Sequence, residues 1–82
     1  MPRVAVRFFA AHREAAGRPG VEVDLPPGAS VGDLRKQLRL EVPALAESGL
    51  PALVAVNGEF ADDARTLRPG DRVALFPPVS GG

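Results

Sequence analysis

The chain has 82 residues, 45% hydrophobic and 24% charged, which is the ordinary composition of one small globular domain. Ten basic residues balance ten acidic ones, so no long-range field recruits nucleic acid or an anionic membrane, and we expect neither as a partner. There is no cysteine and His12 is the only histidine, which excludes thiolate catalysis, disulfides and cysteine–histidine metal clusters. Without a long apolar run or the apolar core of a signal peptide, we expect a cytoplasmic protein.

The first predicted strand covers residues 3–9, where side chains alternate between two faces. Its buried face carries Val4, Val6 and Phe8, and its other face carries Arg3, Ala5, Arg7 and Phe9. An alanine-rich stretch from Ala10 to Gly17 predicts a short helical turn that stops at the glycine. Within that turn, His12 is expected to lie on the surface.

A second strand is predicted over residues 21–25 and a helix after it. Ser30 followed by Asp33 resembles a capping box and predicts the start of the helix. Three apolar residues then form one helical stripe, and three basic residues lie off it and should face solvent. The stripe is Val31, Leu34 and Leu38, and the basic residues are Arg35, Lys36 and Arg39. Pro43 ends the helix, and a short turn follows to Ser48.

Two more strands are predicted in the second half, at residues 53–56 and 72–76. Asn57-Gly58 is a strong hairpin signal, since both residues tolerate positive φ. Arg68-Pro69-Gly70-Asp71 has the residues that a type II turn requires. Asp62-Asp63 is interpreted as the cap of a helix start rather than as a cation site.

This order of elements predicts an α+β fold, a mixed sheet of four to five strands packed on one main helix. A helix between the second and third strands fits the β-grasp topology of ubiquitin-like proteins. We expect residues 1–76 to form this domain and residues 77–82 to form a free, flexible tail.

The end of the chain is the remaining candidate for chemistry. Pro77 and Pro78 favour an extended stem, and the side chains beyond them become small enough to thread a narrow channel. The small residues are Ser80, Gly81 and Gly82, and Val79 connects them to the stem as part of the tail. The Gly82 carboxylate is ionised at neutral pH and can attack an activated phosphate to give an acyl adenylate that sulfur can displace. A frayed terminus without function is the alternative.

Several short motifs resemble the sulfur-carrier family of the MoaD and ThiS type, which includes the small subunit of molybdopterin synthase. They include Phe8-Phe9-Ala10 with Arg13-Glu14, Pro27-Gly28-Ala29-Ser30-Val31, Val56-Asn57-Gly58, Pro69-Gly70-Asp71 and the ending Phe76-Pro77-Pro78-Val79-Ser80-Gly81-Gly82. The resemblance spans essentially the whole chain. Its most specific element is the ending, because both its sequence and its position must match.

The resemblance implies a β-grasp fold and a carrier without an active site of its own. An ATP-dependent adenylating enzyme would activate the Gly82 carboxylate, and a sulfur donor would convert it to a thiocarboxylate. The large subunit of molybdopterin synthase would then receive the tail and pass its sulfur to a pterin precursor. We expect no metal or cofactor bound by the chain itself, with ATP used by the activating enzyme.

Three phenylalanines are expected outside the helix-covered core, while Phe8 belongs to that core. The resemblance assigns the three, which are Phe9, Phe60 and Phe76, to apolar contacts with the large subunit. The alternative is a second, minor core on the other face of the sheet.

Other functions remain open at the level of the sequence. The same tail chemistry serves carriers for thiamine thiazole or tRNA thiolation, which differ in the sulfur acceptor. Gly82 joined to a lysine of a target would make the chain a protein modifier. A ubiquitin-like interaction domain without sulfur chemistry would not use the tail at all.

Overall fold

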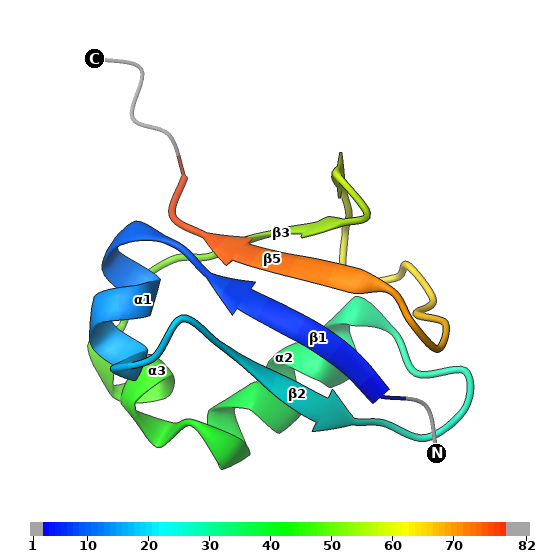
Figure 1. Cartoon of the computed structure of the whole chain (residues 1–82), viewed down its shortest axis with the longest axis horizontal. Helices are drawn as coiled ribbons and strands as arrows, with labels where there is room; N and C mark the ends of the chain where they lie inside the picture. Colours follow the sequence, from blue (N-terminus) through cyan, green and yellow to red (C-terminus); the bar gives the residue numbers. More distant parts are fainter. Residues whose placement is uncertain (1–2, 79–82) are drawn as a thin grey trace.

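The last strand in the sequence lies in the middle of the sheet. The computed structural model describes residues 3–78 (Figure 1). In chain order the elements are β1 (Arg3–Phe8), α1 (Ala10–Ala16), β2 (Gly20–Asp24), α2 (Val31–Glu41), α3 (Pro43–Ser48), β3 (Leu53–Val56), β4 (Glu59–Phe60) and β5 (Arg72–Phe76). The strands lie in the order β2-β1-β5-β3-β4. β5 runs parallel to β1 and antiparallel to β3, so the predicted mixed sheet is confirmed.

One face of this sheet forms the core with α2. The alternation predicted for the first strand is confirmed, since β1 shows a strict exposed–buried pattern. The predicted stripe of α2 is also confirmed, because all three of its residues are buried. From the strands, the buried side chains are Val4, Val6, Phe8, Val23, Val54, Val56, Val73 and Leu75. Figure 1 shows the helices on this side of the sheet and none in front of its other face, which we call the open face.

The start of α2 is held by its own cap and by a distant part of the chain. Ser30 and Asp33 form the predicted capping box: the Ser30 Oγ accepts from the Asp33 N–H at 3.2 Å, and the Asp33 carboxylate accepts from the Ser30 N–H at 2.9 Å. The hydrogen bond from the Ser30 backbone is the main reason that the pKa of Asp33 lies below its usual range. The N–H groups of Val31 and Gly32 donate to the carbonyls of Arg65 and Asp63, so further donors of the first turn find partners.

The interpretation of Asp62-Asp63 as the cap of a helix start is wrong, because no helix begins there in the described part of the chain. The Asp62 carboxylate instead accepts from the Ala64 N–H at 3.0 Å within a turn. The Asp63 carboxylate pairs with the Arg35 guanidinium at 2.7 Å. Arg35, which is predicted to face solvent, is only partly exposed, with 26% of its side chain accessible.

His12 is buried, with 2% of its surface exposed, so its predicted place on the surface is wrong. It belongs to α1, which the sequence predicts as a short, alanine-rich helical turn. The burial comes from tertiary packing: α3 packs against α1, and the segment 50–52 lines the same pocket as the imidazole. Residues near His12 in the sequence do not indicate that these distant segments pack over it.

The two predicted turns, at residues 57–58 and 68–71, are joined through one side chain. Asn57 and Gly58 both have positive φ, 51° and 85°, as a two-residue hairpin requires. The Asn57 side-chain amide donates to Asp71 at 3.0 Å, and its carbonyl oxygen accepts from the Arg72 N–H at 2.9 Å. Asp71 also accepts from the Arg68 N–H at 2.8 Å, which is the largest cause of its lowered pKa. Asn57 therefore couples the β3–β4 hairpin to the start of β5.

None of the described helices is both long and apolar enough to cross a bilayer. Within residues 3–78, no three His, Cys, Asp or Glu side chains converge in a way that could hold a metal ion.

We predict that Asn57→Ala lowers the free energy of unfolding by about 2–3 kcal/mol, because it removes two hydrogen bonds and leaves an L-residue without a local partner at positive φ. Asn57→Gly should lose only about 1–2 kcal/mol, because glycine tolerates positive φ. Urea denaturation of the three proteins measures the difference. A larger loss for glycine than for alanine would contradict the role assigned to this backbone conformation.

Candidate functional site

The end of β5 is the point at which the chain leaves the fold. Phe8 of β1 faces Leu75, and Leu53 of β3 faces Phe76. The Phe9 N–H also donates to the Leu75 carbonyl at 3.1 Å. β5 is therefore paired with β1 on one side and with β3 on the other, up to its last residues. Pro77 and Pro78 follow outside any strand, as expected from residues that lack an N–H for a ladder.

The predicted tail lies largely outside the described residues. The structure covers Pro77 and Pro78, whereas Val79, Ser80, Gly81 and Gly82 lie beyond residue 78. The extended stem and the carboxylate chemistry predicted for this segment therefore stay predictions.

The open face carries an aromatic pair beside the end of β5. Phe60 is 75% exposed, and its ring centroid lies 5.7 Å from that of Phe76, with the planes tilted by 54°. That distance is typical of interacting aromatic side chains. Phe76 is half-buried, and Leu53, which is partly exposed, lies opposite it in the register. These three side chains form an apolar ridge at one end of the open face.

Phe9 lies on the same face, beside Phe76 in the continuation of the β1–β5 register, and borders a hollow. The hollow has a volume of about 360 Å³, and Phe9 lines it with 45% of its own surface exposed. Its floor is low because alanines occupy the central positions of three adjacent strands: Ala5 of β1, Ala74 of β5 and Ala55 of β3. The expectation that three phenylalanines avoid the helix-covered core is thus confirmed, and the alternative of a closed second core does not describe this exposed surface.

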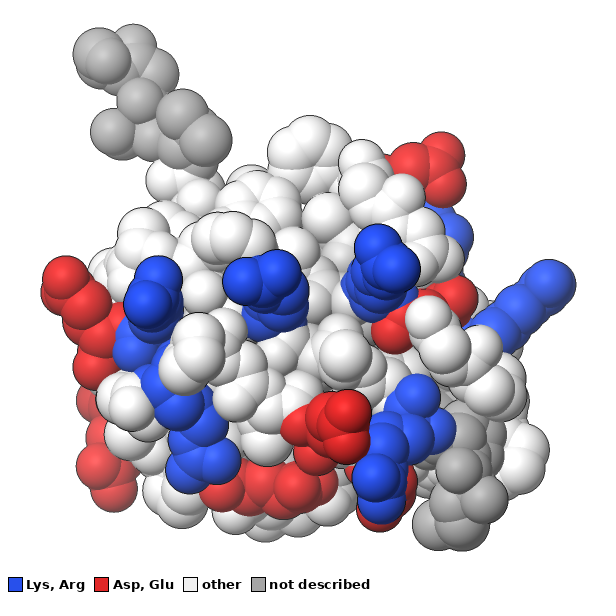
Figure 2. All heavy atoms as spheres, in the orientation of Figure 1, with Lys and Arg blue, Asp and Glu red and all other residues white. Residues whose placement is uncertain are grey.

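Basic side chains also line this face. Arg7 and Arg72 border the hollow, and neither takes part in an ion pair within the described residues. Arg3, at the β2 edge, is instead paired with Asp24 at 2.9 Å and Glu22 at 3.3 Å; the hydrogen bond from Arg3 is the main cause of the lowered pKa of Asp24. Figure 2 shows basic side chains spaced across this view with uncharged surface between them.

The sequence interpretation named the aromatic residues of this face but missed its floor. The alanines and Leu53 were open to detection, because they alternate with the buried valines of their strands. What alternation does not reveal is that β1, β5 and β3 are neighbours in this order, which pairs Ala74 with Ala55 and brings Ala5 to the same hollow.

Comparisons with known proteins agree with this fold. Residues 6–82 match the ThiS family. Over 83 residues the chain is 39% identical to the molybdopterin synthase sulfur carrier subunit of Mycobacterium tuberculosis, and the match covers 100% of both chains.

Solved structures give the same result. The crystal structure of Haloferax volcanii small archaeal modifier protein 1 matches with a TM-score of 0.88 at 33% identity, over 96% of this chain and 100% of that one. A chain in the complex of subunits 1 and 2 of the molybdopterin-converting factor from Helicobacter pylori matches with a TM-score of 0.69 at 28% identity, over 98% and 99% of the two chains. The predicted β-grasp fold and the predicted resemblance are both confirmed: this chain belongs to the ThiS family of sulfur-carrier proteins.

Proposed function

We propose that this chain is the sulfur-carrier small subunit of molybdopterin synthase. The observation that supports this most is the full-length similarity to a molybdopterin synthase sulfur carrier subunit, in a fold whose central strand leads directly into the end of the chain. The chain has no cysteine, so a side-chain thiol is not available to hold sulfur. The group that carries the sulfur, which we call the cargo position, is therefore the carboxyl group of Gly82.

The chemistry of that position follows from an ionised carboxylate. In the first step, a Gly82 carboxylate oxygen attacks the α-phosphorus of ATP on an adenylating enzyme, and pyrophosphate leaves. In the second step, hydrosulfide supplied by the sulfur donor attacks the carbonyl carbon of the adenylate, and AMP leaves. The carboxyl group becomes a thiocarboxylate with no change of oxidation state. The adenylating enzyme supplies the active site for these steps and the carrier supplies the reacting group. ATP and the carried sulfur are thus substrates, and the proposal places the cycle in the cytoplasm.

We assign the open face to docking of the large subunit. Protein interfaces have apolar cores in which aromatic residues and arginine are enriched. The ridge of Phe60, Phe76 and Leu53 supplies exposed apolar surface beside the end of β5. Phe9, which borders the hollow beside the ridge, adds a further apolar contact. A partner seated there would be positioned by the same strand that carries the tail.

The two unpaired arginines suit the rim of such an interface. Arg7 and Arg72 border the shallow floor, and their charges are not neutralised by ion pairs inside the described domain. Carboxylates of the partner placed opposite them would guide the encounter, an effect that weakens as salt rises. The large subunit of this enzyme is therefore expected to present acidic groups around an apolar centre.

The sulfur acceptor has alternatives. Carriers for thiamine thiazole or tRNA thiolation would use the same tail with another acceptor. The similarity to small archaeal modifier protein 1 favours a further candidate, in which an amine of a target protein displaces AMP from the Gly82 adenylate and an isopeptide bond forms. That product retains no sulfur, so the products distinguish the two functions.

We predict that incubation with the adenylating enzyme, ATP and a sulfur donor adds to the chain the mass of one sulfur in place of one oxygen. Intact-mass spectrometry measures the change. A chain that lacks Gly82 is the matched control and should stay unchanged, because it ends on a carboxylate displaced by one residue. No gain with enzymes that load a known carrier, or an equal gain in the control, would refute the assignment of the cargo position.

We also predict that Phe60→Ala weakens binding of the large subunit by about tenfold or more, as expected for an aromatic anchor at an interface. Because Phe60 is 75% exposed, its removal should leave the unfolding midpoint nearly unchanged. Phe76→Ala should weaken binding too, with some loss of stability because its ring is half-buried. Titration calorimetry measures the affinities.

Leu40→Ala provides the control for this experiment. Leu40 is 74% exposed, but it lies on α2, on the helical side of the sheet. Its removal should leave the affinity unchanged. Unchanged affinity in Phe60→Ala, or an equal loss in Leu40→Ala, would show that the open face is not the docking surface.

A further inference from the structure

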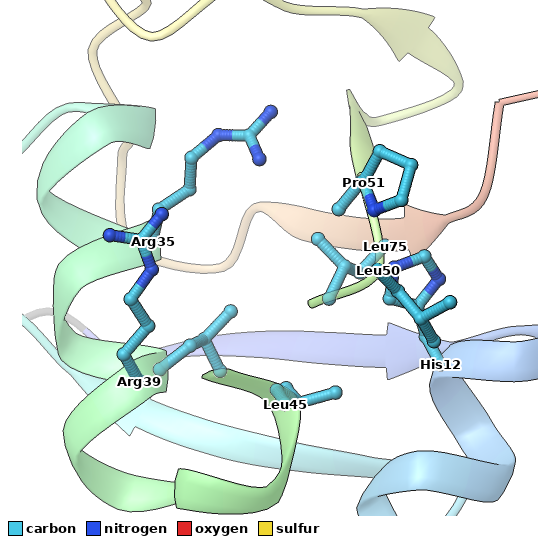
Figure 3. A pocket seen from close by; sticks show the side chains of 9 residues that line it. His12, Arg35, Arg39, Leu45, Leu50, Pro51 and Leu75 are labelled. Atoms are coloured by element: carbon cyan, nitrogen blue, oxygen red, sulfur yellow. The ribbon is translucent and has the colours of Figure 1, made fainter. Parts of the chain in front are cut away.

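The helical side of the sheet contains a pocket that the carrier function does not use. It has a volume of about 280 Å³ and lies on the opposite side of β5 from the open face. Figure 3 shows Arg35 and Arg39 on α2 along one wall, and Leu50, Pro51 and His12 along the other. Leu45 comes from α3, and Leu75 comes from β5. Four elements and the segment 50–52 therefore meet around this space.

His12 forms the inner polar group of this pocket. The residue is 2% exposed, and neither Nδ1 nor Nε2 has a hydrogen-bond partner among the described residues. A buried polar group without a partner is costly, and a buried charge without one costs far more. Burial is the main cause of a lowered pKa for His12. A backbone group of Pro51 lies near enough to oppose this effect, but its geometry is not that of a hydrogen bond. Burial without a partner therefore favours the neutral form of the imidazole while the surrounding segments are closed over it.

Within residues 3–78, no carboxylate lines the pocket to pair with a protonated His12. From α2, the charged groups that line it are Arg35 and Arg39. The Asp63 carboxylate balances Arg35 at 2.7 Å, whereas Arg39 has no ion-pair partner within the described residues and repels an imidazolium. On α1, Arg13 and Glu14 are exposed neighbours in sequence. Glu47 of α3 is exposed and does not line the pocket, and the segment 50–52 and β5 contribute only apolar side chains to it. A positive charge on the ring would therefore be desolvated and would have no carboxylate of the pocket lining to pair with.

We propose that His12 is a proton-sensitive latch that holds α3 and the segment 50–52 against α1 while it is neutral and releases them when it is protonated. Release gives the imidazolium access to water, which the closed packing denies it. The parts that move are the ones least tied to the sheet, because no strand pairing of the described sheet involves residues 43–52. The β-strands and α2 stay folded in the released state.

The latch lies close to the strand that carries the tail. Leu75 lines the pocket, and its carbonyl accepts the hydrogen bond from the Phe9 N–H. Phe76, the next residue, belongs to the ridge on the open face. Acidification therefore loosens the packing beneath the end of β5, on the face opposite the docking surface. This inference goes beyond the proposed function and does not require that the chain carry sulfur.

The direction of the pH effect follows from proton linkage. Above about pH 6.5, histidine is neutral in both the closed and the open state, and the closed state has its full stability. As the pH falls below this value, the open state binds a proton and the closed state does not. The equilibrium constant that favours the closed over the open state then falls by up to about tenfold for each pH unit. This fall ends when the pH reaches the lowered pKa of the closed state.

The experiment is an NMR titration of the full chain between about pH 8 and pH 5, a range that spans the ordinary histidine pKa of about 6.5. Amide hydrogen exchange is measured at the highest and the lowest pH of this range. His12 is the only histidine, so its ring resonances report on one group. We expect it to titrate below that ordinary value. After correction for the intrinsic pH dependence of exchange, protection of residues 43–52 should fall by about tenfold or more at the acidic end, while β1 and β5 stay protected.

His12→Leu is the matched variant, because leucine fills the site without a titratable group. Its protection over residues 43–52 should change by less than about twofold across the same range. A His12 ring that titrates at or above its ordinary value in the wild-type chain would overturn the proposal without any variant. Equal acid-induced loss of protection in wild type and His12→Leu, or loss spread evenly over the sheet, would overturn it as well.

Discussion

The two-sided pairing of β5 is the constraint on which the rest of the structure depends. The last strand in the sequence takes the central place of the sheet, parallel to β1 and antiparallel to β3. An interior strand cannot shift its register without moving its neighbours, because a slip of one residue would exchange its buried and exposed faces. The point at which the chain leaves the fold is therefore set by the whole domain, and the tail begins from a rigid platform.

This placement also creates two different surfaces at the same end of the molecule. On the open face, β5 contributes Phe76 and Ala74, which form part of the apolar ridge and of the hollow beside it. On the helical side, it contributes Leu75, which lines the pocket that contains His12. Alternation along one strand thus separates the proposed docking surface from the proposed latch by the thickness of the sheet. The first surface is apolar with unpaired arginines, and the second encloses a polar group without a partner among the described residues.

Local signals in the sequence predict the elements well. The alternation of β1, the capping box at Ser30 and the Asn57-Gly58 turn each depend on residues close together in the chain, and the structure confirms all three. The order of the strands is different, because the neighbours β1 and β5 are separated by most of the sequence. The predicted exposure of His12 is wrong for the same reason, because its burial depends on α3 and Pro51, which are distant from it in the sequence. The candidate site shows the same contrast. Its aromatic residues are predicted from the sequence, but its floor of alanines can be recognised only once the strand order is known.

The central claim is that the end of this chain delivers sulfur while the open face holds the partner. Its most direct test is a single-turnover reaction of the thiocarboxylated chain with the large subunit and the pterin precursor, followed by mass spectrometry of both protein and pterin. The account predicts that the chain returns to its carboxylate mass as sulfur appears in the pterin, and that Phe60→Ala slows both changes together. A chain that keeps its sulfur with a competent large subunit, or sulfur that reaches the pterin equally fast without the open-face ridge, would contradict it.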